Sequence, residues 1–222
     1  MLIMNRIKGD HMTNVLVVGA SGQISLETTQ LLLDNTTANV TLFLRTPQKL
    51  PDYNNHRVTI IEGDATDEHR LNYALENIDV VFASLAGGVD AQAESIISAM
   101  RNQGVKRLIF VTALGIYNEV KGVFGEWNNA HIGPALPPYQ RAAEAIENSD
   151  LDYTILRPAW LTNADEIAYE TTQKGEDFKG TEVSRKSVAA LAVDIIQNPN
   201  KHVRESLGVN KPNTDGDKPS WM

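Results

Sequence analysis

Short, continuously apolar runs recur along the chain and alternate with longer segments whose apolar residues have helical spacing. The runs are rich in β-branched residues, which is typical of strands buried on both faces. They occupy residues 15–18, 40–44, 58–61, 80–83, 108–111 and 153–156. Helices are expected after the first run, with Ile24, Leu31 and Leu32 on one face, and at 67–75, 91–101, 140–147 and 187–197.

Strands that alternate with helices in this way predict an α/β fold with a parallel, doubly wound sheet and right-handed crossovers. The segment 117–138 has no clear period and contains three glycines and three prolines, so we expect a long loop there. Residues 47–57 are polar and turn-rich and are expected to form a loop or a short helix. The tail from residue 211 is rich in proline, glycine and aspartate and is expected to be irregular.

The turn after the first run has the sequence Gly-Ala-Ser-Gly over residues 19–22. A strand, a glycine turn and a helix in this order are typical of a dinucleotide-binding site. Gly19 can adopt the φ of a tight turn, and Gly22 lets the backbone approach a pyrophosphate at the helix N-terminus. Ser25 stands in place of the usual third glycine, so helix and strand are expected to pack slightly less closely. The alternative is a structural turn that binds no ligand.

Glycines or polar residues follow the carboxyl ends of five predicted strands, at 19–22, Arg45, Asp64, 84–88 and Thr112. Ligands of doubly wound sheets bind at this edge, so the convergence predicts a single site there. Asp64, followed by Ala65, is placed to contact the adenine edge of a nucleotide. It could equally cap the helix that begins near Asp67.

The second strand ends in a cation at the position where a chain that binds NAD usually has a carboxylate. Arg45 follows the strand directly, Lys49 is nearby, and no carboxylate precedes Asp52. A guanidinium can bind a 2′-phosphate through two hydrogen bonds and stack on adenine. NADP(H) is therefore expected to be preferred over NAD(H). The alternative is that Arg45 is a solvated charge at a strand end.

The composition and net charge of the chain argue against several classes of function. The net charge of −8 over 222 residues argues against a general binder of nucleic acid or anionic membrane. The absence of cysteine excludes disulfides, thiolate catalysis and Cys-ligated zinc, and is compatible with the cytoplasm, the expected location. No apolar run approaches the roughly 18–20 residues of a membrane span, and residues 1–12 do not resemble a signal peptide. Residues 1–12 are expected to be an upstream extension, with Met12 as the native start, or a remnant added for expression. A single domain is expected over 13–222.

Several motifs resemble the atypical short-chain dehydrogenase/reductase family, in its NAD(P)H-binding, NmrA-like branch. They are VVGASGQI at 17–24, FLR at 43–45, EGDATD at 62–67, LIFVTALGIY at 108–117, LDYTILRPAWLT at 151–162 and TEVSRKSVA at 181–189. The resemblance implies a Rossmann domain with strand order 3-2-1-4-5-6-7 and a small lobe, from about 117–138 and 159–222, over the nicotinamide. It implies a cofactor site made of Gly19, Ser21, Gly22, Gln23, Ile24, Arg45, Asp64, Ala65, Leu85, Ala86, Thr112 and Pro158.

The chain departs from this family at the catalytic pair. Active members use a Tyr-x-x-x-Lys pair, in which the lysine lowers the pKa of the tyrosine. Here Tyr139 is followed four positions later by Ala143. Thr112 is the residue that could replace the family's serine after the fifth strand. We expect Tyr139 and Thr112 to be the acid/base candidates, with Tyr139 as a packing or capping residue as the alternative.

The segment after the fifth strand is rich in polar and aromatic side chains and is expected to supply a substrate pocket. Its candidates are Tyr117, Asn118, Glu126 and Trp127, with Asn128 and His131 nearby, and each of them could instead be structural. Arg185 and Lys186 could contact a substrate, or form a solvated pair or an ion pair with Glu182. The five histidines have no metal-ligand spacing and no G-x-S-x-G motif occurs, so neither a metal site nor a serine hydrolase is expected.

The leading hypothesis is an NADP(H)-binding reductase that transfers a hydride to a small unidentified substrate. The rival is a non-catalytic NADP(H) sensor whose binding to a protein partner changes with the redox state of the dinucleotide. The broken Tyr/Lys pair favours the sensor, and the crowded polar segment favours the enzyme. Neither nucleic acid nor membrane is an expected partner, and a homodimer is compatible with both hypotheses.

Overall fold

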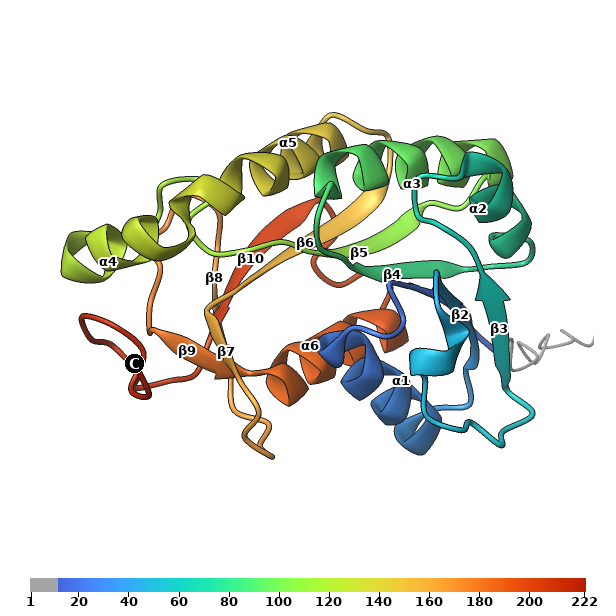
Figure 1. Cartoon of the computed structure of the whole chain (residues 1–222), viewed down its shortest axis with the longest axis horizontal. Coiled ribbons are helices and arrows are strands. Elements are labelled where there is room, and N and C mark those ends of the chain that lie inside the picture. Colours follow the sequence, from blue (N-terminus) through green and yellow to red (C-terminus); the bar gives the residue numbers. More distant parts are fainter. Residues whose placement is uncertain (1–11) are drawn as a thin grey trace, which may run out of the picture.

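A central sheet of eight strands carries helices on both of its faces (Figure 1). The computed structural model describes residues 12–222, so the predicted extension at 1–12 lies, apart from Met12, outside the described residues. The strands are β1 (Asn14–Val18), β2 (Asn39–Leu44), β3 (Val58–Glu62), β4 (Val80–Ser84), β5 (Arg107–Val111), β6 (Asp152–Pro158), β7 (Trp160–Thr162), β8 (Glu170–Thr172), β9 (Glu182–Ser184) and β10 (Glu205–Asn210).

The helices match the predicted ones in number and order except in the middle of the chain. They are α1 (Gln23–Asn35), α2 (Glu68–Ala74), α3 (Val89–Gln103), α4 (Gly122–Ile132), α5 (Leu136–Glu147) and α6 (Arg185–Gln197), with the 3-10 turns η1 (Pro47–Lys49) and η2 (Gly133–Ala135). Across the described part of the chain, none of the helices has the length and apolar character that crossing a membrane requires.

The strand order of the large sheet is β3-β2-β1-β4-β5-β6-β10-β8. All neighbours in it are parallel except β8, which pairs antiparallel with β10 at the edge. The predicted α/β class, with a doubly wound parallel sheet, is therefore confirmed, and β10 takes the seventh place. The sequence pattern missed β7 to β10, because three of them have only three residues and β10 lacks a continuous apolar run.

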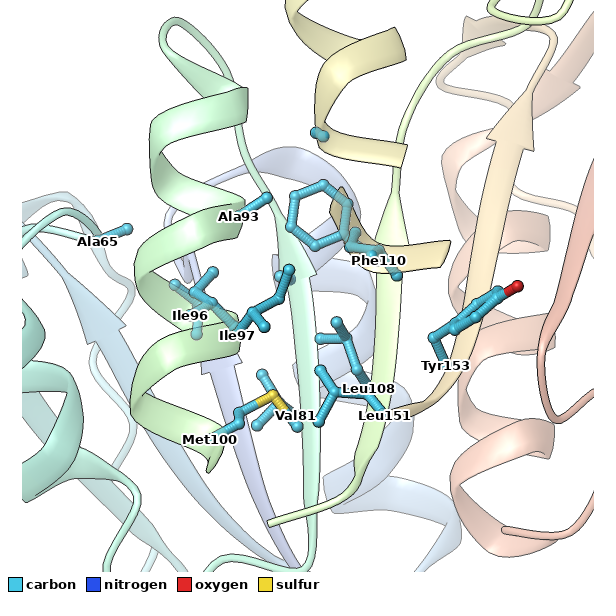
Figure 2. Packing of buried hydrophobic residues seen from close by; sticks show 14 of the residues in the cluster. Ala65, Val81, Ala93, Ile96, Ile97, Met100, Leu108, Phe110, Leu151 and Tyr153 are labelled. Atoms are coloured by element: carbon cyan, nitrogen blue, oxygen red, sulfur yellow. The ribbon is translucent and has the colours of Figure 1, made fainter. Parts of the chain in front are cut away.

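Two apolar cores, one on each face of the sheet, explain why the strands are continuously apolar. Leu16 and Val18 face the core beneath α2, α3 and α5, whereas Val15 and Val17 face the core beneath α1 and α6. Figure 2 shows the first core, where Met100 and its neighbours on α3 pack against residues of β4 and β5. Burial of such side chains is the main favourable contribution to folding.

The predicted long loop over 117–138 is wrong, because most of it forms α4, η2 and the start of α5. Two of the three glycines that suggested a loop are needed for the helix. Gly122 has a φ of +62° where α4 begins, and a Cβ on Gly125 would lie 2.3 Å from the Val120 carbonyl oxygen. Pro137 and Pro138 lie in the first turn of α5, where backbone N–H groups need no helical partner.

A buried ion pair fastens the turn after β5 to the sheet. Arg157 on β6 and Glu119 form a salt bridge with side-chain exposures of 0% and 3%. The carboxylate of Glu119 also accepts hydrogen bonds from the backbone N–H groups of Gly115 (3.0 Å) and Tyr117 (2.9 Å). Arg157 Nε donates to Ser206 Oγ on β10 at 3.1 Å. The pair therefore connects β6, β10 and the turn that follows β5.

Candidate functional site

A cavity of about 590 Å³ lies at the carboxyl ends of β1 to β4. Its volume is within the range of roughly 300–1,000 Å³ that is usual for small-molecule sites. The structure brings together the predicted residues Gly19, Ser21, Gly22, Gln23, Ile24, Arg45, Asp64, Ala65, Leu85 and Ala86 in its lining. Ser84 and Lys49, which the sequence placed near the site, also line it, whereas sequence reasoning did not assign to the cofactor site the further lining residues Phe43, Leu44, Thr46, Gly63, Gln92, Leu161 and Arg185.

The glycine turn is shaped by its two neighbouring strands. Gly19 has a φ of +79°, and a Cβ there would lie 2.4 Å from the Ser84 carbonyl oxygen on β4. Its N–H donates to the Phe43 carbonyl on β2 at 3.0 Å. Gly19 is therefore required by the fold itself, because no side chain fits between β1 and β4.

Gly22 has a different role, because its backbone is ordinary. It is the N-cap of α1 with a φ of −68°, and a Cβ would lie 3.2 Å from the Gly19 carbonyl oxygen. The N-cap residue makes no side-chain hydrogen bond to this end of α1, and the first turn of the helix carries no acidic residue. Ser25 is fully buried behind the turn, and its hydroxyl has no hydrogen-bond partner in the described chain. A bare helix N-terminus with an unpartnered hydroxyl behind it suits an anionic group such as a diphosphate.

Arg45 and Asp64 define one end of the cavity. Their side chains are 3.9 Å apart, and the side chain of Arg45 is 74% exposed, so the pair is loose and contributes little to stability. Asp64 accepts hydrogen bonds from Thr66 N (2.9 Å) and Thr66 Oγ1 (2.7 Å), and these bonds lower the pKa of its carboxyl group. Asp67, not Asp64, caps α2 by accepting from Arg70 N at 3.1 Å. The capping alternative for Asp64 is wrong.

Tyr139 is not part of the cavity lining, but its hydroxyl contacts a residue that is. It lies in the first turn of α5, half-buried, and its hydroxyl donates to the Leu85 carbonyl at 3.4 Å. Leu85 itself lines the cavity. Burial raises the pKa of Tyr139 above the ordinary value of a tyrosine. Ala143, one turn further along α5, is fully buried.

Thr112 and Pro158 do not belong to the cavity lining. Thr112 is buried between β5 and β6, and its hydroxyl donates to the Leu156 carbonyl at 3.2 Å. Pro158 is the buried last residue of β6, and its carbonyl accepts from Leu114 N at 3.3 Å. The strand ends were placed correctly from sequence, but the spacing does not say which way a side chain at a strand end turns.

Tyr117, Asn118 and Glu126, which were predicted to bind substrate, also lie outside the lining. Tyr117 is half-buried, and its hydroxyl donates to Glu147 Oε1 at 2.7 Å. Lys174 Nζ lies 4.3 Å from the centre of its ring. Asn118 makes a turn with a φ of +57°, and Glu126 is exposed on α4.

Trp127 belongs to an aromatic cluster between α4 and β7. Its ring stacks on His131 with centroids 4.0 Å apart and meets the Trp160 ring edge-on at 4.8 Å. Trp160 Nε1 donates to Asn128 Oδ1 at 2.9 Å. The structural alternative fits these residues best, because they bind one another. Their cluster could not be found from sequence, since Trp160 is 33 positions beyond Trp127.

Arg185 lines the cavity, and the sequence left its role undecided between a substrate contact, a solvated charge and an ion pair. It opens α6, and its Nη1 donates to Asn163 Oδ1 at 2.7 Å. Lys186 pairs instead with Asp165 at 2.5 Å. The predicted ion pair with Glu182 is wrong, because the Glu182 carboxylate accepts hydrogen bonds from the N–H and hydroxyl of Ser220.

A dinucleotide fits these residues. Its diphosphate would lie on the N-terminus of α1, which Gly22 leaves open. Its adenosine would lie between Arg45, Lys49 and Asp64, and its nicotinamide half would extend towards Leu85. No described residues form a cluster of acidic or histidine side chains able to hold a metal ion.

Known proteins resemble this chain over nearly its whole length. A family model described as NAD(P)H-binding matches residues 19–199. A Rossmann-fold NAD(P)-binding family protein from Shigella flexneri is 49% identical, with a TM-score of 0.83 over 96% of this chain and 100% of that one. A short-chain dehydrogenase/reductase from Veillonella parvula, solved in complex with NADP, is 31% identical, with a TM-score of 0.90 over 95% and 100%. The uncharacterized sugar epimerase YhfK of Bacillus subtilis is 26% identical over 202 residues, which are 86% of this chain and 91% of that protein.

Proposed function

Because this chain belongs to the NAD(P)H-binding family, as its short-chain dehydrogenase/reductase motifs predicted, we propose that it is an NADP(H)-dependent reductase acting on a small substrate. The observation that carries the cofactor preference is the cationic adenosine end of the cavity, where Arg45 and Lys49 follow β2. Asp64 is the acidic residue at this end of the cavity, and the hydrogen bonds that its carboxylate accepts from Thr66 fix the orientation of its side chain. The Veillonella relative, which was solved in complex with NADP, supports binding of this cofactor.

Arg45→Glu is expected to reverse the preference between NADPH and NADH. Losing a guanidinium–phosphate contact and adding a repelling carboxylate should lower NADPH affinity by about 2–3 kcal/mol, while NADH affinity changes little. Fluorescence titration of both cofactors measures this. The matched control is Arg101→Glu, since Arg101 is an exposed cation at the end of α3, away from the cavity. Equal affinities of the unaltered protein for NADPH and NADH would contradict the preference.

Within this function the bound dinucleotide supplies a hydride from the C4 position of its nicotinamide. The protein orients it through the α1 N-terminus and the cationic residues after β2. The Tyr139 phenol is protonated at neutral pH even at its ordinary pKa of about 10, and burial raises that pKa further. It can therefore donate a hydrogen bond or a proton to an oxygen that gains charge, but it is a poor base. This favours reduction over oxidation.

Tyr139→Phe is expected to lower kcat by roughly a hundredfold and to leave NADPH affinity unchanged, because it removes only a proton donor. Stopped-flow or steady-state NADPH oxidation measures kcat once a substrate is identified. Tyr153→Phe is the control, since Tyr153 lies on β6 with Arg204 over its ring and, unlike Tyr139, has no hydrogen bond from its hydroxyl to a lining residue of the cavity. Turnover of the Tyr139→Phe variant at the parent rate would make Tyr139 a packing residue.

A second candidate function is an NADP(H) sensor that does not catalyse. The specific observation in its favour is Ala143, fully buried at the position that a Tyr-x-x-x-Lys pair starting at Tyr139 would require to be lysine. Screening NADPH oxidation against quinones, flavins, aldehydes and nucleotide-sugars separates the two functions. Turnover of any of them supports the reductase. Tight NADPH binding without turnover favours the sensor, and redox-dependent binding of a partner would then be the property to measure.

A further inference from the structure

Arg185 lies where two cavities and two helix N-termini meet. It lines the main cavity and a second cavity of about 290 Å³ beside it. Gln23, the first residue of α1, lines both cavities as well. α1 follows β1 and α6 precedes β10, and both strands are parallel members of one sheet, so the two helices begin at the same edge. Figure 1 shows α1 and α6 side by side on one face.

The charge of Arg185 is not balanced within the described chain. Its guanidinium donates to the neutral amide of Asn163, and no described carboxylate forms an ion pair with it. Its neighbour Lys186, by contrast, is paired with Asp165. Arg185 also stands in the first turn of α6, where the helix dipole disfavours a cation. Partial burial lowers the pKa of this guanidinium, as expected for a cation without an acidic partner.

The part of the main cavity beside Arg185 is built to receive negative charge but otherwise lacks a cation. The turn from Gly19 to Ile24 offers backbone groups and no basic side chain. Arg45 and Lys49 lie at the adenosine end, after β2. A diphosphate on the α1 N-terminus would therefore have Arg185 as the nearby cationic side chain. The several N–H donors of a guanidinium match phosphate oxygens in pairs.

We propose that Arg185 binds the diphosphate of the dinucleotide beside the α1 N-terminus. The inference rests on the proposed NADP(H) function. It makes Arg185 a cofactor-positioning residue that belongs to the segment after β6. Binding of the dinucleotide would thereby connect the N-terminus of α6, and Asn163 through its hydrogen bond to Arg185, with the glycine turn at 19–22. An anionic group of the substrate is the competing ligand for Arg185. Gln23, the first residue of α1, lines the same two cavities as Arg185, and this favours the diphosphate at the α1 N-terminus as the ligand.

Calorimetric titration of two ligands tests the proposal. NADP⁺ carries the diphosphate, whereas adenosine 2′-monophosphate keeps the adenosine and the 2′-phosphate and lacks it. Arg185→Met should weaken NADP⁺ binding by roughly 10- to 100-fold and leave binding of adenosine 2′-monophosphate unchanged. Arg45→Met should weaken both. Lys186→Met is the matched control, because it removes the neighbouring cation of the same helix turn, and it should change neither affinity.

Arg185→Lys should give an intermediate NADP⁺ affinity, because it keeps the charge and loses the paired donors. Thermal unfolding of each variant checks that the fold is retained. An Arg185→Met protein that binds NADP⁺ as the parent does would overturn this proposal and leave the proposed function standing. So would equal losses for the two ligands. A parent protein that does not bind NADP⁺ would overturn the proposed function and this inference together.

Discussion

Arg157→Leu is expected to lower the free energy of unfolding by about 3–5 kcal/mol. The variant leaves Glu119 charged and buried without its cationic partner. It also removes the hydrogen bond from Arg157 Nε to Ser206 on β10. Removing one member of a buried ion pair costs more than the pair contributes, because the remaining charge is neither hydrated nor paired. Denaturation by urea, followed by circular dichroism, measures the loss.

Arg101→Leu is the matched control for this prediction. Arg101 pairs with Asp150 at 3.6 Å, with side-chain exposures of 61% and 54%. An exposed pair of this kind is worth at most about 1 kcal/mol. The double variant Arg157→Leu/Glu119→Leu should recover only part of the loss, since Glu119 also holds the N–H groups of Gly115 and Tyr117. A loss for Arg157→Leu no larger than for Arg101→Leu would contradict the structural role of the pair.

Gly22→Val is expected to weaken NADPH binding at least a thousandfold, or by about 4 kcal/mol, while the fold is retained. A Cβ at Gly22 would already lie 3.2 Å from the Gly19 carbonyl oxygen, and the two further methyl groups would occupy the approach to the α1 N-terminus. The diphosphate would lose several charge-assisted hydrogen bonds to backbone N–H groups at once. Its φ of −68° is one that valine adopts, so the turn itself need not change.

Fluorescence titration with NADPH measures this loss, and the circular dichroism spectrum reports whether the fold persists. Gly133→Val supplies the control, because Gly133 has a helical φ of −47° and a Cβ there would meet only the Asn129 Cβ at 3.9 Å. That variant should bind NADPH as the parent does. Unchanged NADPH affinity in a natively folded Gly22→Val protein would mean that the glycine turn is structural and that the dinucleotide lies elsewhere.

The sequence by itself determined the α/β class, the first six strands and the cofactor edge of the sheet. A strand covered on both faces must be apolar at every position, and this pattern is local, so Val15 to Val18 could be recognised without knowing their partners. The carboxyl ends of parallel strands meet at one edge whatever the details of packing. For that reason Gly22, Arg45 and Asp64 could be assigned to one site from their positions after strands.

Only the tertiary structure decided where helix α4 lies and what its side chains do. Its local signal opposes a helix, since Gly122 and Gly125 have low helix propensity. The helix exists because Gly125 packs on Val120 and because Trp127 and Asn128 contact Trp160. Packing of this kind outweighs propensity and cannot be read from a window of neighbouring residues.

The direction of single side chains was likewise decided by the tertiary structure. Thr112 follows a strand end as Arg45 does, yet its hydroxyl turns to Leu156, 44 positions away. Tyr139 meets Leu85 across 54 positions, and Arg157 meets Glu119 across 38. Each contact depends on which strands are neighbours and on their register, which are set by the free energy of the whole sheet and its two cores. The local sequence pattern predicts the individual helices and strands, whereas the contacts between distant residues form only when those helices and strands pack together.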